Sequence, residues 1–257
     1  MQIQNKHVLI TGANRGIGYA IARMCAEEKA HLHLVIRTES KSLIEELLAF
    51  GAQTVQVYLA DLASQKDVNS LSERISKSKI DILINNAGQL TGGLIEEQPL
   101  EEIDSMFQVN LLALIQLTRA VIPQMVQRGS GKIINNASVS SLMYFPCAST
   151  YSASKAAVLA FTECIENELT GTGVTTLSLI TPGIKTRMFD QIQVKYEKHL
   201  GVPTDSISPT EYAQRIKMAI FDERRHLFPT GSTHWGLWIS KWLPGLFRWE
   251  VKRRFHR

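Results

Sequence analysis

Short apolar runs alternate with longer segments of helical periodicity along most of this chain. Strand and helix in strict alternation form right-handed βαβ crossovers, and strands apolar on both faces are typical of a parallel sheet buried between helices. The predicted strands are residues 7–10, 33–36, 54–59, 81–84, 132–135 and 174–180, and the predicted helices are residues 18–29, 41–50, 66–77, 100–128 and 151–169. The fold class predicted is therefore α/β, a doubly wound parallel sheet with helices on both faces.

The alternation ends at Pro182. Residues 185–209 are rich in polar residues, contain two prolines and show no strand pattern, so residues 185–230 are predicted to form a substrate-binding lobe. Residues 231–257 form an aromatic and basic C-terminal tail. No linker composition marks a second independent unit, so residues 1–257 are expected to be a single domain.

Composition excludes several classes of protein. The net charge of +4 is too small to indicate a nucleic-acid partner. The three cysteines, Cys25, Cys147 and Cys164, have no CxxC spacing, and the histidines show no ligand spacing, so neither a disulfide framework nor a metal is expected. The N-terminus shows no signal-peptide pattern, and no run of 18 uncharged apolar residues occurs. A cytoplasmic location is expected.

A glycine-rich turn, TGANRGIG from Thr11, joins the first predicted strand to the first predicted helix. Glycines allow the backbone to turn tightly, and peptide N–H groups at a helix N-terminus bind pyrophosphate. The pattern predicts a dinucleotide site, although a tight turn without a ligand can have the same glycines. The cofactor-binding residues expected here are Gly12, Asn14, Arg15, Gly16, Ile17 and Gly18.

The second predicted strand ends beside Arg37, 19 residues after Gly18. At this place an acidic residue binds the ribose 2′-hydroxyl of NAD, whereas an arginine accommodates the 2′-phosphate of NADP. Arg15 can reach the same phosphate, so the two arginines favour NADP(H). Glu39 lies close by, and an ordinary solvated strand end is the alternative interpretation of Arg37.

Tyr151 and Lys155 lie four residues apart at the start of a predicted helix. Residues i and i+4 share a helix face, so the ammonium group can lie beside the phenol. A neighbouring cation stabilises the phenolate and lowers a pKa that is ordinarily about 10. The pair is therefore a candidate proton donor and acceptor, although this spacing alone more often marks an exposed surface pair.

Further polar or turn-forming residues follow the fourth, fifth and sixth predicted strands, at the edge where open α/β sheets bind ligands. They are Asn86, Ala87, Gly88, Ser138, Pro182 and Gly183. Asn110 lies inside the longest predicted helix, where a buried amide costs stability unless it is hydrogen-bonded. Taken alone, Asn110 is more often a satisfied core amide than a functional one.

Together these residues resemble the short-chain dehydrogenase/reductase family, of the compact single-domain type. The resemblance spans about residues 5–190, with the motifs in the family's order and spacing. The matching segments are TGANRGIG from Thr11, Asp61-Leu62, NNAG from Asn85, Asn110, Ser138, YSASK from Tyr151, and PG at Pro182. The resemblance implies a Rossmann-like fold and an oxidoreductase that uses NADP(H) to interconvert a carbonyl and an alcohol.

The resemblance also implies roles for single residues. Tyr151 would be the general acid in reduction, Lys155 would bond the nicotinamide ribose and lower the tyrosine pKa, and Ser138 would hydrogen-bond the substrate carbonyl. Asn110 would hold a water molecule that links Lys155 to solvent. Further cofactor contacts are implied for Asp61, Leu62, Asn86, Ala87, Gly88, Pro182, Gly183 and Thr186.

Two features depart from the family pattern. The threonine usually follows as PGxxxT, and here the spacing is PGxxT, which weakens the assignment of Thr186. Asn136 and Ala137 precede Ser138 where a Ser-Ser pair is common. The alternative function is a non-catalytic NADP(H)-binding sensor or scaffold of the same fold. Such proteins typically lose the tyrosine or the lysine, and both are present here.

The expected substrate is a small hydrophobic carbonyl or alcohol, lipid-, retinoid- or steroid-like. The pocket-side residues on which this rests are Leu142, Tyr144, Phe145, Met188 and Phe189. The tail holds all four tryptophans beside lysines and arginines, which suits peripheral contact with a membrane interface. Packing of these aromatics on the protein's own core or on a partner subunit is equally open. The two long helices suggest a homo-oligomer, a dimer or a tetramer.

Overall fold

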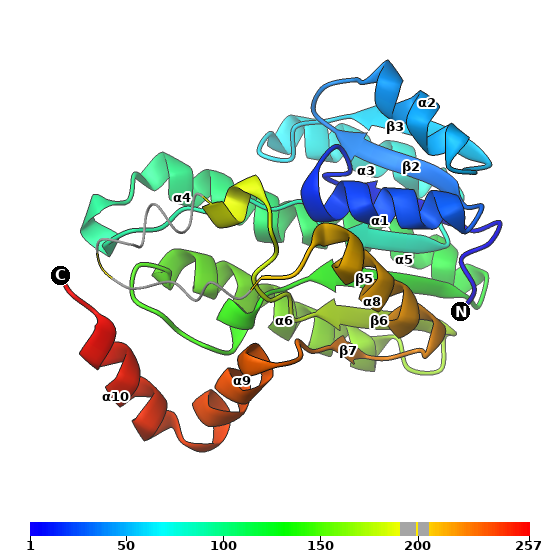
Figure 1. The fold of residues 1–257 in the computed structure, drawn as a ribbon. Helices are drawn as coiled ribbons and strands as arrows, with labels where there is room; N and C mark the ends of the chain where they lie inside the picture. Colours follow the sequence, from blue (N-terminus) through cyan, green and yellow to red (C-terminus); the bar gives the residue numbers. More distant parts are fainter. Residues whose placement is uncertain (191–198, 200–205) are drawn as a thin grey trace.

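A computed structural model of the chain describes residues 1–190, 199 and 206–257 (Figure 1). Seven parallel strands form one sheet in the order β3-β2-β1-β4-β5-β6-β7. The strands are β1 (His7–Thr11), β2 (His31–Ile36), β3 (Thr54–Leu59), β4 (Ile82–Asn85), β5 (Gly131–Asn136), β6 (Val174–Leu179) and β7 (His226–Leu227). The strand order reverses between β1 and β4, which is where ligands bind in doubly wound sheets. The predicted fold class is confirmed.

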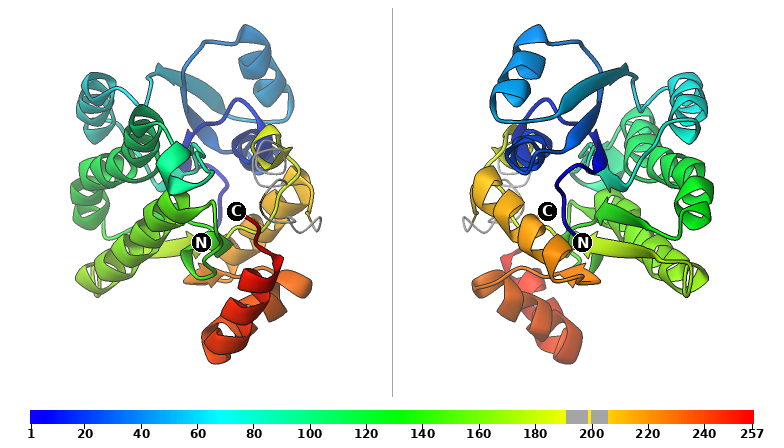
Figure 2. Two further views of the ribbon diagram at one scale, coloured as in Figure 1. Left: turned by 90° about the vertical axis from the view of Figure 1, so that its left-hand side faces the viewer. Right: turned by 90° about the vertical axis from the view of Figure 1, so that its right-hand side faces the viewer.

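Helices cover both faces of the sheet, as the end-on views show (Figure 2). One face carries α1 (Gly16–Glu27), α2 (Lys41–Ala49) and α8 (Pro209–Phe221), and the other carries α3 (Gln65–Ser76), α5 (Ala113–Gln127) and α6 (Ser149–Glu168). Alternate residues of one strand point to the two faces of the sheet. Ile10 packs in the core on the α1–α2–α8 face, and Leu9 packs in the core on the α3–α5–α6 face. The inner strands predicted from sequence therefore have both faces buried, whereas β3, at one edge of the sheet, is largely exposed or half-buried.

The predicted helix 100–128 is present as a continuous helical segment with an internal irregularity. It consists of α4 (Leu100–Phe107), a π-helical turn (Gln108–Leu112) and α5. Residues Leu100–Gln127 are long and apolar enough to span a membrane by length and composition, which was not expected from the sequence. Leu117, Val121 and Met125 are nevertheless fully buried in the core beneath the sheet, so this segment is a core helix.

The region after Pro182 completes the sheet and then leaves it. Within residues 185–230, β7 pairs with β6, and α8 packs against α1. Residues 191–198 and 200–205 of the predicted substrate-binding lobe lie outside the described residues. The tail forms two helices, α9 (Ser232–Trp242) and α10 (Pro244–Arg254), beyond the β7 edge of the sheet (Figure 1).

Candidate active site

A cavity of about 2020 Å³ opens at the carboxyl ends of the strands. All of the site residues predicted from the sequence line it, except Asn110. The segments that follow β1, β2, β3, β4, β5 and β6 each contribute to its wall. The structure therefore brings to one place residues that are up to 174 positions apart in the chain, Gly12 and Thr186 being the extremes.

The glycine-rich turn has no room for side chains. Gly12 has a φ of +69°, and a Cβ atom added to it would lie 3.1 Å from the Cα atom of Ala87. A Cβ atom on Gly18 would lie 2.1 Å from the carbonyl oxygen of Gly12 and 2.6 Å from Nδ2 of Asn86. Helix α1 begins at Gly16, has no acidic residue in its first turn and borders the cavity. This arrangement can accept an anion at the helix N-terminus.

Thr11 connects the glycine-rich turn to the segment that follows β4. Its hydroxyl oxygen accepts hydrogen bonds from the amides of Asn86 (3.0 Å) and Ala87 (2.9 Å). The Asn86 side chain in turn donates to the Thr11 carbonyl at 3.0 Å. Thr11 was not selected from the sequence as a site residue, although it is the first residue of the motif. Its hydroxyl fixes the relative position of two loops that line the cavity.

Arg15 and Arg37 are exposed and both line the cavity, together with Asp61 and Leu62. Neither arginine forms an ion pair within residues 1–190, 199 or 206–257. Glu39 is exposed and is not among the residues that line the cavity. This end of the cavity therefore presents two guanidinium groups that no described residue pairs.

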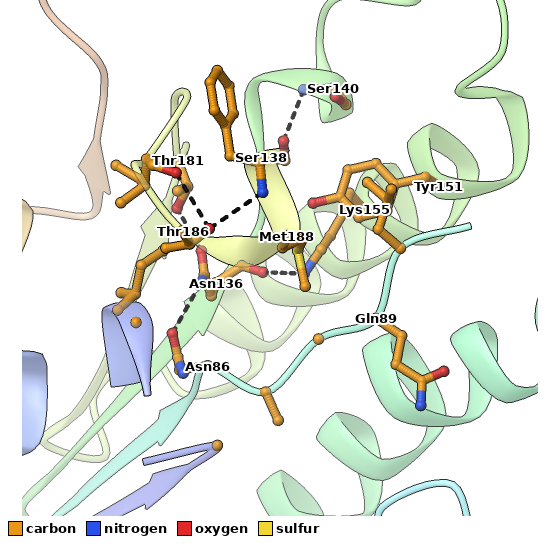
Figure 3. Close-up of a pocket in the computed structure, with 18 of the residues that line it drawn as sticks. Asn86, Gln89, Asn136, Ser138, Ser140, Tyr151, Lys155, Thr181, Thr186 and Met188 are labelled. Carbon is orange, nitrogen blue, oxygen red and sulfur yellow. Dashed lines mark hydrogen bonds between the residues drawn. The ribbon is translucent and has the colours of Figure 1, made fainter. Parts of the chain in front are cut away.

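Tyr151 and Lys155 project from the first turns of α6 toward Ser138, which follows β5 (Figure 3). The Lys155 ammonium group is buried, donates to the Asn136 carbonyl at 2.7 Å and lies 6.0 Å from the centroid of the Tyr151 ring. The Ser138 hydroxyl accepts from the Ser140 amide at 3.1 Å. Phenol, ammonium and hydroxyl groups thus border one point of the cavity.

Burial moves the pKa values of Tyr151 and Lys155 in opposite directions. It raises the pKa of Tyr151 to about 12, against a smaller lowering by a hydrogen bond with Ser138. It lowers the pKa of Lys155 to about 8. The expected lowering of the Tyr151 pKa by Lys155 is not found; burial is the main influence on the phenol, and the Ser138 hydrogen bond is what opposes it. The lysine directs its hydrogen bond to a backbone carbonyl instead.

Asn110 lies in the π-helical turn and is fully hydrogen-bonded. Its amide nitrogen donates to the Gln89 carbonyl (2.9 Å) and to the Ser154 hydroxyl (3.2 Å), and its oxygen accepts from the Gln89 amide (2.8 Å). A Cβ atom on Gly88 would lie 3.4 Å from Asn110 Oδ1 and 3.7 Å from Lys155 Nζ. Asn110 therefore lies behind Gly88, and its role in holding a water molecule stays a prediction.

Asn136 is the centre of a hydrogen-bond network. In the sequence this residue departs from the family pattern. Its carbonyl accepts from Lys155, and its side chain donates to Asn86 at 3.2 Å and accepts from the Thr181 hydroxyl. Thr181 also shares a 2.8 Å hydrogen bond with Tyr212 of α8. Asn136 thus ties Lys155 to the loops after β4 and β6.

The substrate end of the cavity differs in part from the prediction. Phe145, Met188 and Phe189 line it, whereas Leu142 and Tyr144 do not and are 39% and 64% exposed. That part of the prediction is wrong, because the chain after Ser138 turns in a 3-10 helix (Val139–Ser141) that leaves these two side chains on the surface.

Three predicted cavity residues and an unpredicted wall complete this end. Pro182 and Gly183 line the cavity, as does Thr186, whose Cγ2 atom lies 3.2 Å from the position of a Cβ atom on Gly16. Helices α9 and α10 supply residues that the sequence did not suggest for the site, namely Ser232, Thr233, Gly236 and Phe247. The tail is thus part of the cavity wall.

Known proteins share this arrangement. The profile of the short chain dehydrogenase family matches residues 6–197. The ketoacyl reductase HetN of Nostoc sp. is 36% identical over 224 residues, which cover 85% of this chain and 76% of that protein. A short-chain dehydrogenase from Sphingobium yanoikuyae, solved in complex with NADPH, has a TM-score of 0.80 at 26% identity, and the match covers 98% of this chain and 97% of that one.

A third relative is the bulky-bulky ketone specific alcohol dehydrogenase from Comamonas testosteroni. Its TM-score is 0.78 at 25% identity, and the match covers 95% of this chain and 94% of that one. The chain belongs to the short-chain dehydrogenase/reductase family, as its motifs indicated. It is an oxidoreductase of that family, with a cavity placed to receive a nicotinamide cofactor.

Proposed function

We propose that the protein is an NADP(H)-dependent oxidoreductase that interconverts a carbonyl and an alcohol on a hydrophobic substrate, with Tyr151 as the general acid and base. The observation that carries this proposal is the meeting of Tyr151, Lys155 and Ser138 at one wall of a cavity whose other end is a glycine-rich turn. A sensor or scaffold needs only the turn, whereas proton transfer needs the three side chains as well.

The residues present fit a dinucleotide. Side chains are excluded at Gly12 and Gly18 by backbone atoms within 3.1 Å of their added Cβ atoms, and the N-terminus of α1 borders the same space. The residues that would hold the cofactor are Gly12, Asn14, Arg15, Gly16, Ile17, Gly18, Arg37, Asp61, Leu62, Asn86, Ala87, Gly88, Tyr151, Lys155, Pro182, Gly183 and Thr186. When bound, NADP(H) supplies or accepts the hydride.

The preference for NADP(H) over NAD(H) rests on Arg15 and Arg37. Both guanidinium groups line the cavity without an ion-pair partner in the described part of the chain. A 2′-phosphate offers such groups charge-assisted hydrogen bonds that a ribose hydroxyl cannot match. The relative from Sphingobium yanoikuyae was solved with NADPH, which supports the same preference here.

The proton chemistry follows from the surroundings of Tyr151. In reduction, its hydroxyl and that of Ser138 would hydrogen-bond the substrate oxygen, and Tyr151 would donate its proton as negative charge develops there. The resulting phenolate would be stabilised by the Ser138 hydroxyl and by the nearby Lys155 ammonium group. The backbone carbonyl of Asn136 accepts a hydrogen bond from Lys155 and so fixes the position of the ammonium group. Because this partner is not a carboxylate, it does not cancel the positive charge.

A hydrophobic substrate is supported by the apolar side chains around the wider end of the cavity. These are Met143, Phe145, Met188, Phe189 and Phe247. Two relatives act on carbonyl compounds by name, a ketoacyl reductase and an alcohol dehydrogenase specific for bulky ketones. A lipid-, retinoid- or steroid-like carbonyl or alcohol therefore fits this chain best.

The test is NADPH consumption with a panel of ketones and aldehydes of increasing apolar size. Tyr151→Phe should lower kcat/KM by roughly 10²-fold or more while leaving NADPH binding in place. Tyr144→Phe is the matched control, because Tyr144 is 64% exposed and lies outside the cavity. Equal activity of Tyr151→Phe and the wild type would refute the acid role. NADPH binding without turnover of any panel member would favour the sensor.

The proposal includes a homo-oligomer, dimer or tetramer, in the cytoplasm, with peripheral membrane contact through residues 231–257. Exposed apolar residues on the helices of the α3–α5–α6 face, Leu112 (46% exposed) and Val126 (38% exposed), support association of subunits there. Light scattering during size-exclusion chromatography measures the subunit number directly.

A further inference from the structure

Helix α9 has two different faces. Gly236 and Thr233 line the cavity, and Leu237 is buried in a core cluster with Met143 and Ile180. The opposite face carries Trp235, Trp238 and Trp242, which are 63%, 46% and 62% exposed. Their spacing of three and four residues places them along one stripe of the helix. One helix therefore closes the cavity on one side and presents tryptophan to solvent on the other.

The exposed apolar stripe continues into α10. Leu243, Leu246 and Trp249 are 46%, 51% and 60% exposed, while Phe247 turns inward and packs edge-on against Phe145, with ring centroids 5.6 Å apart. All four tryptophans of the chain are thus exposed on this helical pair. The two helices lie beyond the β7 edge, at the margin of the molecule (Figures 1 and 2).

Positive charge is concentrated on the same segment. Residues 231–257 contain six basic residues and one acidic residue, whereas residues 1–230 contain 22 basic and 23 acidic residues. Lys241, Arg248 and Lys252 form no ion pair with any described residue, and Lys241 lies 5.3 Å from the ring centroid of Trp242. The apolar stripe is therefore flanked by uncompensated cations.

From these observations we infer that α9 and α10 are a docking surface for an anionic lipid bilayer, through which an apolar substrate reaches the cavity. Tryptophan beside lysine and arginine suits the headgroup region, where both the apolar ring and the cation are stabilised. A second copy of the chain fits less well, because two tails brought together would repel each other. This inference rests on the proposed function, since it names the source of the hydrophobic substrate.

The geometry connects docking to substrate access. The helices that carry the exposed tryptophans also supply Gly236 and Phe247 to the cavity wall. A helix is about 10 Å in diameter, so a docked protein would hold its cavity about that distance from the bilayer. A substrate dissolved in the bilayer would then reach the cavity without crossing bulk water.

Vesicle flotation of the full chain tests the inference, with phosphatidylcholine alone and with phosphatidylcholine containing about 30% phosphatidylserine. Point variants are preferable to truncation, because Leu237 and Phe247 belong to the core and to the cavity wall. One variant combines Trp235→Ser, Trp238→Ser and Trp242→Ser, and another combines Lys241→Gln, Arg248→Gln and Lys252→Gln. Met218→Ser on α8, at a 55% exposed side chain, is the matched control.

The wild type and the Met218 control should float with the anionic vesicles only, and less so at high salt. The tryptophan variant should bind at least roughly tenfold more weakly, and the charge variant roughly 100-fold more weakly. Turnover of a water-soluble ketone should be unchanged in every variant, while turnover of a long-chain ketone embedded in the vesicles should fall in both triple variants.

Two results would overturn the inference. One is a wild type that floats with neither vesicle, or a tryptophan variant that floats as well as the wild type. The other is a wild type that does not bind vesicles but forms an oligomer, together with a tryptophan variant in which that oligomer dissociates. A second copy of the chain would then cover this surface. Failure of the proposed function looks different: vesicle binding would persist, but no soluble carbonyl would be turned over.

Discussion

A buried histidine near the amino ends of the strands, His33, is remote from the cavity and should make the protein less stable in mild acid. His33 is 6% exposed and hydrogen-bonds His7 at 3.0 Å and the Tyr58 hydroxyl at 3.3 Å. Burial, followed by the charges of His7 and His31, lowers the pKa of His33 to about 4, and Asp81 opposes this shift weakly. Folding therefore requires His33 to stay neutral at pH values where a solvated imidazole is protonated.

The sign and the size of the effect follow from these values. Well above pH 6.5 the imidazole is neutral in both the folded and the unfolded chain, so it leaves the free energy of unfolding unchanged. As pH falls from 6.5 toward 4, only the unfolded chain binds the proton, and stability is lost. The full loss is about 3 kcal/mol, of which about 2 kcal/mol has occurred at pH 4.5. A domain with a total stability of 5–15 kcal/mol would show this clearly.

Urea unfolding at pH 7 and pH 4.5 measures the loss, and His33→Gln isolates the contribution of this residue. The amide keeps a donor and an acceptor for His7 and Tyr58 but does not titrate. Its loss of stability between the two pH values should be about 2 kcal/mol smaller than that of the wild type. His234→Asn, at an exposed position on α9, should behave as the wild type. An equal acid sensitivity of His33→Gln and the wild type would refute the reasoning.

Three further changes test the cofactor and catalytic sites. Gly18→Ala should weaken NADPH binding at least roughly tenfold, because its Cβ atom would lie 2.1 Å from the Gly12 carbonyl; an unchanged Kd in a fluorescence titration would contradict this. Arg37→Ala should raise KM for NADPH roughly tenfold or more and leave KM for NADH nearly constant, since it removes a charge-assisted contact to the 2′-phosphate. Equal rises in both KM values would argue against that contact. Lys155→Met should lower kcat/KM by roughly 10²-fold in steady-state assays, and full activity would exclude a role in proton transfer.

Local motifs made much of the fold and site predictable. The strands β1 to β6 and the helices α1, α2, α3 and α6 lie within two residues of their predicted ends, because apolar periodicity is written along the chain itself. The glycines at 12 and 18 could be identified because close backbone contacts leave few alternatives to that residue. Motif residues at the carboxyl ends of parallel strands meet at one edge, so their convergence followed from topology.

Features that depend on packing between distant segments could not be found in this way. The π-helical turn at Asn110 shifts the hydrogen-bond pattern without altering the apolar periodicity. The backbone carbonyl of Asn136 accepts a hydrogen bond from Lys155, but every residue has such a carbonyl, so the residue type at position 136 gave no sign of this contact. The 3-10 turn after Ser138 leaves Leu142 and Tyr144 on the surface, and the sequence pattern did not reveal this turn. The place of Phe247 in the cavity wall depends on how α9 and α10 pack onto the body.

Burial raises the pKa of Tyr151, where a lowering was expected, and thereby also determines the protonation state of the phenol at neutral pH. With a pKa raised to about 12, the phenol holds its proton at neutral pH, which is the state needed to protonate a reduced carbonyl. Oxidation of an alcohol instead requires the phenolate, and here burial opposes that form. The Lys155 pKa of about 8 lies near neutral pH, so the ammonium charge that assists the phenolate is itself lost in mild alkali. At neutral pH Tyr151 therefore holds the protonation state that reduction requires, because α6 places its side chain in a buried position.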